Sequence, residues 1–143
     1  MLFKRISRND AETAFIVVKN VSGSTMTAGY HAFFDVSTLA DGVRVTLATT
    51  GSLQAYAGCV DASLANNGFG LVQVYGYRAA GYTYGSGTTT SGDALMPVNG
   101  SWALEATTEA VTSGFKSWGF MCETVGSTAA STSANKRIFI RAL

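Results

Sequence analysis

The sequence is poor in the residues that most protein chemistry requires. Only 13% of its 143 residues are charged, and it contains one histidine, one proline and two cysteines. A typical domain carries about 25% charged residues. Metal sites draw on clustered cysteine and histidine, whereas Cys59 and Cys122 are far apart and neither has a histidine beside it. The sequence therefore predicts no metal site. We expect two buried free thiols, and a disulfide between them is the alternative.

Catalytic motifs are also missing. A serine-hydrolase triad would have to use His31, which lies among aromatic residues and has no nucleophile motif of the G-x-S-x-G type. The glycine-rich stretch 85–92 lacks the G-K-[ST] ending of a phosphate-binding loop, so we expect an exposed flexible loop there. The carboxylates are scattered, without the flanking pair of a glycosidase. The sequence thus predicts a structural His31, no catalytic residue and no cofactor.

Long apolar runs are absent as well. No run approaches the roughly 18 residues of a membrane-spanning helix. The first ten residues carry charge but lack the apolar centre of a signal peptide. We therefore expect a soluble protein that is made in a cytoplasm and has no membrane partner.

The few charges are unevenly placed, because both ends of the chain are basic and the middle is acidic. Residues 9–135 carry all nine acids against four bases, although the whole chain has a net charge of only +1. Such a molecule is attracted to copies of itself or to a neighbour with an acidic rim. Basic arms also bind phosphate, but the acidic body would repel nucleic acid, so we expect no direct nucleic-acid contact. The terminal bases are Lys4, Arg5 and Arg8, and Lys136, Arg137 and Arg141.

The pattern of apolar residues predicts an all-β fold. Residues 43–47 alternate with Val43 and Val45 inward, and residues 53–59 alternate with Cys59 inward and Tyr56 outward. Residues 71–77 form the strongest predicted strand, and 137–141 form a terminal strand. With 16 glycines marking turns, eight to ten short strands are expected, as in a small compact β-barrel or sandwich. Residues 1–14 are predicted to be an extended basic N-terminal arm, and residues 15–143 a single β domain.

Four tyrosines in one stretch admit two interpretations. They could stack against sugars or bases, or they could supply core and interface area. We favour the second. The four residues are Tyr75, Tyr77, Tyr82 and Tyr84.

A series of short motifs gives the chain a family resemblance. It is similar to small virion structural proteins of tailed bacteriophages, especially head decoration (cement) proteins. The resemblance covers residues 3–143. The motifs are F-K-R-I-S-R-N-D, F-I-V-V-K-N-V, G-C-V-D-A-S, N-N-G-F-G, L-V-Q-V-Y-G-Y, G-D-A-L, W-G-F-M-C-E-T and R-I-F-I-R-A-L.

The resemblance implies a β-barrel or β-tulip-like fold, a homotrimer, a place on the outer surface of the capsid and no catalysis. Members of this class use a flexible terminal arm to reach neighbouring shell subunits, and the matching segment is residues 1–14. The partner would be the major capsid protein. The arm and the basic C-terminal strand then supply the expected interface, which consists of Leu2, Phe3, Lys4, Arg5, Ile6, Arg8, Arg137 and Arg141.

Physical reasoning supports this assignment. Ordering an arm costs about 1–2 kcal/mol of backbone entropy per residue, which buried Leu2, Phe3 and Ile6 would offset at roughly 25 cal/mol per Å². Two alternatives stay open. One is a head–tail joining or tail-associated virion protein, and the other is a carbohydrate-binding β-sandwich that uses Tyr82 or Tyr84.

Overall fold

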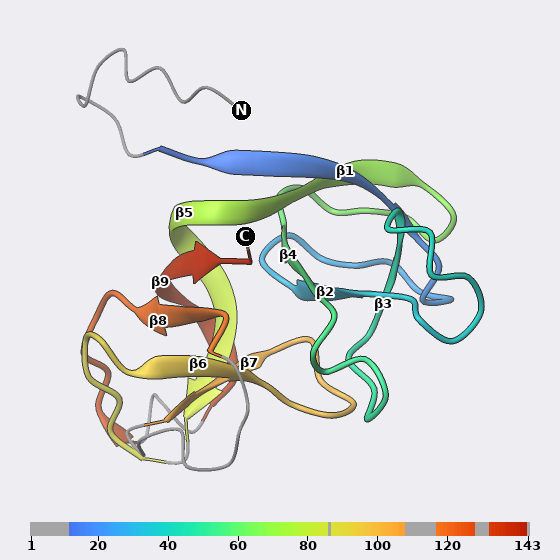
Figure 1. The fold of residues 1–143 in the computed structure, drawn as a ribbon. Helices are drawn as coiled ribbons and strands as arrows, with labels where there is room; N and C mark the ends of the chain where they lie inside the picture. Colours follow the sequence, from blue (N-terminus) through green and yellow to red (C-terminus); the bar gives the residue numbers. More distant parts are fainter. Residues whose placement is uncertain (1–11, 86, 108–116, 128–131, 143) are drawn as a thin grey trace.

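A computed structural model describes residues 12–85, 87–107, 117–127 and 132–142 of the chain (Figure 1). These residues form nine strands, so the predicted all-β fold is confirmed. The strands are β1 (Ala14–Asn20), β2 (His31–Phe34), β3 (Arg44–Thr46), β4 (Tyr56–Val60), β5 (Phe69–Gly85), β6 (Ala94–Pro97), β7 (Leu104–Thr107), β8 (Gly119–Met121) and β9 (Ala134–Arg141).

The strands form one mixed sheet that closes on itself in two rings sharing β5. The first ring runs β5–β1–β3–β2–β4 and returns to β5, and the second runs β5–β7–β6–β8–β9 and returns to β5. The β1–β3 and β5–β7 pairs are parallel and the others are antiparallel. Each of these nine strands has a partner on both sides. Closure of this kind removes the free strand edges through which sheets aggregate.

The long strand β5 passes from one ring to the other at Gly76. Residues before this glycine pair with β1 and β4, those after it pair with β9 and β7, and Tyr75 pairs with both β1 and β9. Gly76 has a φ of 107°, and a side chain there would collide with the backbone carbonyl of Glu12. A bulge between Arg78 and Gly81 turns the strand further. The resulting bend is visible where β5 turns downward in Figure 1.

Each ring encloses its own apolar core, and the cores meet at β2 and β4. The first is built around Val18, Val45 and Val72, and the second around Leu104, Met121 and Ile138. All five residues of β4 are buried, because this strand has a core on each side. The predicted outward position of Tyr56 is therefore wrong, since its ring packs edge-on against Phe33 in the second core.

Two further expectations need correction. Val43 is 39% exposed because it precedes β3, so only Val45 of that predicted strand is fully buried. The stretch 85–92 is not simply an exposed loop. Gly85 ends β5, and the buried Thr89 exchanges two backbone hydrogen bonds, of 3.0 and 2.8 Å, with Val125.

The structure also tests the predictions for the terminal strand, the arm boundary and the cysteines. The terminal strand is confirmed, with Ile138 and Ile140 buried on one side of β9. β1 begins at Ala14, the last residue assigned to the arm, whereas residues 1–11 lie outside the described part. Cys59 and Cys122 are both free thiols, but only Cys59 is buried, so the expected burial of Cys122 is wrong.

Candidate functional site

Aromatic and arginine side chains gather on the outer side of β5, β8 and β9. The Phe120 and Phe139 rings are stacked, with centroids 5.1 Å apart and planes 8° apart. Tyr75 meets Phe139 edge-on, with centroids 5.2 Å apart, and Tyr77 lies opposite Phe139 in the strand register. We call this surface the aromatic face. Its residues are Tyr75, Tyr77, Phe120, Arg137, Phe139 and Arg141.

Strand periodicity places these side chains together. Successive residues of a strand point to opposite sides, so the buried Ile138 and Ile140 put Arg137, Phe139 and Arg141 on the outer side of β9. Tyr75 and Tyr77 are 38% and 39% exposed. The aromatic side chains of this face are thus available to a partner, while the opposite side of β9 contributes Ile138 and Ile140 to the core.

The two predicted arginines of this face differ in their surroundings. The backbone N–H and Nε of Arg137 donate hydrogen bonds of 2.6 and 3.1 Å to the Glu123 carboxylate. These contacts hold the pKa of Glu123 below its usual value, with the backbone bond as the largest cause. Arg141 is exposed and forms no salt bridge with any residue in the described part of the chain. Arg141 is therefore the more available cation.

Both basic ends of the chain join the body beside Tyr75. In β5, Tyr75 pairs with Ala14 of β1 on one side and with Arg141 of β9 on the other. Glu12, where the described chain begins, packs its carbonyl over Gly76. The six predicted arm residues Leu2, Phe3, Lys4, Arg5, Ile6 and Arg8 lie outside the described part. Segments from opposite ends of the sequence nevertheless attach at one corner, next to the aromatic face.

The four tyrosines do not form a single platform. Tyr82 is half-buried, with its ring centroid 5.0 Å from that of Tyr30, which in turn stacks on Trp102. The β5 bulge separates this cluster from Tyr75 and Tyr77. Phe120 and Phe139 are surface residues that the sequence did not single out. The alternation within 137–141 already placed Phe139 on the side of the two arginines, whereas the stacking on Phe120 depends on the pairing of β8 with β9.

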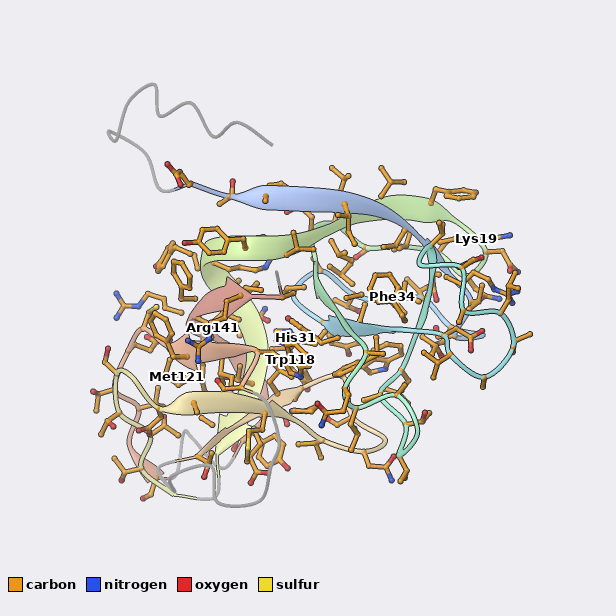
Figure 2. All side chains as sticks on the ribbon, in the orientation of Figure 1. Lys19, His31, Phe34, Trp118, Met121 and Arg141 are labelled. Atoms are coloured by element: carbon orange, nitrogen blue, oxygen red, sulfur yellow. The ribbon has the colours of Figure 1, made fainter. Side chains whose placement is uncertain are left out.

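The histidine and the cysteines are in environments that favour their neutral forms. His31 lies in the interior of the molecule (Figure 2). Its Nδ1 and the Tyr56 hydroxyl share a hydrogen bond of 2.7 Å. Burial, reinforced by the positive charge of Arg78, lowers the pKa of His31 from 6.5 to about 3. Burial also raises the pKa of Cys59 to about 12 and raises that of Cys122. A reactive thiol needs the opposite shift.

Other features of the described residues offer little to a small ligand. A cavity of about 210 Å³, lined by the 35–38 and 46–52 segments with Val21, is smaller than the usual ligand pocket of about 300–1,000 Å³. The Asp35 carboxylate at this cavity accepts a hydrogen bond from the Ser37 hydroxyl, which lowers its pKa. Within the described ranges, no three His, Cys, Asp or Glu side chains form a group able to hold a metal ion. No helix in those ranges is long and apolar enough to cross a membrane.

Comparison with known proteins identifies a structural neighbour. The sequence matches no family model, and no curated protein is similar to it in sequence. In structure, the chain is similar to the head fiber gp8.5 N base of bacteriophage phi29. The TM-score is 0.50 at 11% sequence identity, and the alignment covers 92% of this chain and 96% of that one. The likeness spans both rings, so this chain shares the fold of a phage head fiber base.

Proposed function

We propose that this protein is a non-enzymatic phage virion structural protein. It binds the outer surface of a capsid and stabilises contacts between major capsid proteins, as a decoration or cement protein does. It does so as a homotrimer, without a cofactor and without direct contact to nucleic acid or membrane. The shared fold with a phage head fiber base supports a virion role.

The meeting of β1 and β9 beside the aromatic face is the observation that carries this proposal. Tyr75 pairs with both Ala14 and Arg141, so the start of β1, to which the proposed arm is joined, and the C-terminal strand lie at the same corner of the body. Aromatic and arginine side chains are the groups that contribute most to protein interfaces. A capsid subunit with an acidic rim would meet Arg137, Arg141 and the exposed rings together, with Lys4, Arg5 and Arg8 of the arm as further proposed contacts.

The construction of the body suits a stabilising role. Two closed rings leave the described strands no free edge, so the body neither adds strands to a neighbour nor offers its own for exchange. A cement protein acts through many modest contacts and needs a rigid body that holds them in place. Attachment is therefore proposed to use the aromatic face together with the arm.

Quantitative mass spectrometry of purified particles, scaled to the major capsid protein, tests the proposal. A copy number comparable to that of the major capsid protein supports a decoration protein. A handful of copies per particle would instead support the head–tail joining or tail-associated alternative. Absence from particles would overturn a virion role altogether.

A further inference from the structure

The small cavity between the loops that follow β2 and β3 has a polar lining, and we call it the loop cavity. The loop 35–43 joins β2 to β3, and the loop 47–55 joins β3 to β4. Five of the nine residues that line the cavity carry a hydroxyl group, and a sixth is an aspartate. In Figure 2, Phe34, which directly precedes Asp35, lies away from Arg141 of the aromatic face. The loop cavity is therefore separate from the surface that we assign to the capsid. Its polar lining residues are Asp35, Ser37, Thr38, Thr46, Thr49 and Ser52.

The Asp35 side chain in this lining is 7% exposed, and only one of its two carboxylate oxygens is hydrogen-bonded. Oδ1 accepts hydrogen bonds of 3.0 and 2.8 Å from the N–H and the hydroxyl of Ser37, and one of 3.2 Å from the N–H of Thr38. Oδ2 accepts none from any residue in the described part of the chain. The cation paired with it, Arg44 Nη2, is 3.9 Å away, which is beyond hydrogen-bonding distance.

This arrangement leaves a charged acceptor without a donor. The hydrogen bond from the Ser37 hydroxyl is the largest cause that lowers the pKa of Asp35, so the carboxylate is ionised at neutral pH. A buried carboxylate oxygen without a hydrogen-bond donor carries an uncompensated desolvation cost. A ligand in the loop cavity that donates a hydrogen bond to Oδ2 removes this cost.

We propose that the loop cavity binds a neutral, polyhydroxylated molecule of the size of one sugar ring. One hydroxyl group of the ligand donates to Asp35 Oδ2, and its other hydroxyl groups exchange hydrogen bonds with the serine and threonine side chains of the lining. This binding activity is additional to the capsid attachment proposed above and uses a different surface.

The remaining lining groups suit a ligand of this kind. The Thr38 and Thr46 hydroxyls form no hydrogen bond with any other residue in the described ranges, so both are available to a ligand. Each hydroxyl can donate one hydrogen bond and accept two, as the hydroxyl groups of a sugar can. Val21 and Val36 also line the cavity and supply apolar area for the C–H groups of a ring.

The charges at the loop cavity favour a neutral ligand over an ion. The ionised Asp35 carboxylate repels an anion. Arg44 already lies opposite this carboxylate, so a cationic ligand would be repelled by the guanidinium group. A metal ion is also disfavoured, because no three His, Cys, Asp or Glu side chains of the described residues are grouped to hold one. Hydroxyl groups satisfy Asp35 Oδ2 without adding charge.

The size of the loop cavity limits the ligand to a single ring. Its volume of about 210 Å³ corresponds to roughly seven water molecules, which excludes an extended ligand. With so few atoms in contact, we expect a dissociation constant in the millimolar range. On a particle that carries many copies of the protein, as proposed above, such weak sites would act together on a surface that displays the same sugar repeatedly.

Nuclear magnetic resonance titration of the isotope-labelled full chain tests the proposal. The probes are D-glucose, D-galactose and D-mannose, with n-butylammonium chloride and calcium chloride as cationic comparisons. We expect at least one of the three sugars to shift the amide signals of Ser37, Thr38 and Thr49 at millimolar concentration. The N–H groups of these residues donate to Asp35 or Ser52, so they report on the lining directly.

Two variants locate the binding in the loop cavity. Asp35→Asn removes the charge but keeps the shape, and it should weaken sugar binding about tenfold. Gly51→Leu should abolish binding, because Gly51 lines the cavity and a side chain there meets open space rather than the protein. The matched control is Gly126→Leu, since Gly126 also has open space around it but lies beyond β8. This control should bind the sugar as the wild type does.

Three results would overturn the proposal. One is that none of the three sugars shifts these signals up to its limit of solubility. Another is that only the cationic probes shift them, which would make the cavity a cation site. The third is that Gly51→Leu binds the sugar as well as Gly126→Leu does, which would place the binding elsewhere. All of these measurements use the isolated protein, so they are independent of the particle copy number that tests the virion role.

Discussion

The guanidinium group of Arg78 donates a hydrogen bond of 2.8 Å from Nη2 to the backbone carbonyl of Val60. The same group reaches Asp61 and the side chain of Gln73, and its Nε donates to the Ala80 carbonyl. Arg78 lies where β5 bulges, and Val60 ends β4. One side chain thus ties the bend of the shared strand to the first ring.

Replacing Arg78 by methionine should therefore destabilise the body by about 2–3 kcal/mol, because several acceptors, three of them in partly buried hydrogen bonds, lose their donor. Asp61→Asn should cost less than about 1 kcal/mol, since the Asp61 side chain is 45% exposed. Urea unfolding of both variants measures the difference. Equal losses would mean that the ion pair, and not the contacts to the backbone, is what matters at this junction.

The buried His31 predicts a pH dependence of stability. The unfolded chain takes up a proton near pH 6.5, whereas folded His31 has a pKa of about 3. The stability that depends on neutral, buried His31 is therefore fully present above pH 6.5 and is lost as the pH falls toward 3. Between pH 6 and 5 the free energy of unfolding should decrease by about 1.2 kcal/mol.

This slope belongs to His31 because the chain has no other histidine. The lowered pKa values of Asp35, Asp41 and Glu123 act mainly below about pH 5, because the unfolded carboxyls, with ordinary values of 3.8 to 4.5, take up most of their protons there. Urea titrations at several pH values should show the slope in wild type and in Tyr56→Phe but not in His31→Gln. A slope that persists in His31→Gln would assign it to another group.

Local pattern was enough to predict the all-β fold and the terminal strand, and it identified some residues of the aromatic face. The alternation in 137–141 gave the correct inner and outer sides of β9, because one side of that strand is buried and the other is not. Arg137 and Arg141 were predicted from charge alone, and the structure places them beside Phe139. The four tyrosines were also noticed, although only Tyr75 and Tyr77 belong to this surface.

What depends on long-range pairing could not be predicted. Tyr56 was expected to point outward because its neighbours alternate, but β4 lies between two cores and has no exposed side. The predicted strand 71–77 covers only part of β5, which extends from Phe69 to Gly85. Within this extension, Gly81 keeps β5 close to β9, where a side chain would collide with Ile138. The meeting of both chain ends at Tyr75 follows from pairings across the whole sequence.

Gly76 should be the least replaceable glycine at the junction of the rings. Gly76→Ala adds a side chain at a positive φ and against the Glu12 carbonyl, so we expect a loss of about 2–4 kcal/mol. Gly92 has a φ of 100° but open space around it, so Gly92→Ala isolates the backbone strain at about 1 kcal/mol. Thermal unfolding of the two variants compares them, and equal losses would show that the close approach of Glu12 is unimportant.

Removing residues 1–12 should leave the body folded and weaken its attachment to particles. The described β1 begins at Ala14, so the truncation retains every strand pairing. Far-ultraviolet circular dichroism should be unchanged, and binding to particles that lack the protein should fall at least about tenfold. Unchanged binding by the truncated protein would contradict a role for the arm.

The aromatic face should contribute to attachment independently of the arm. Phe139→Ala and Arg141→Gln each remove a group suited to an interface, and we expect each to weaken particle binding by about ten- to a hundredfold. Arg137→Gln should weaken it less, because the Arg137 guanidinium is already paired with Glu123. Binding of each labelled variant to particles that lack the protein gives the comparison, with Val36→Thr and Leu39→Thr as controls on another surface. If Arg137→Gln proved as damaging as Arg141→Gln, net charge rather than the geometry of this face would govern attachment.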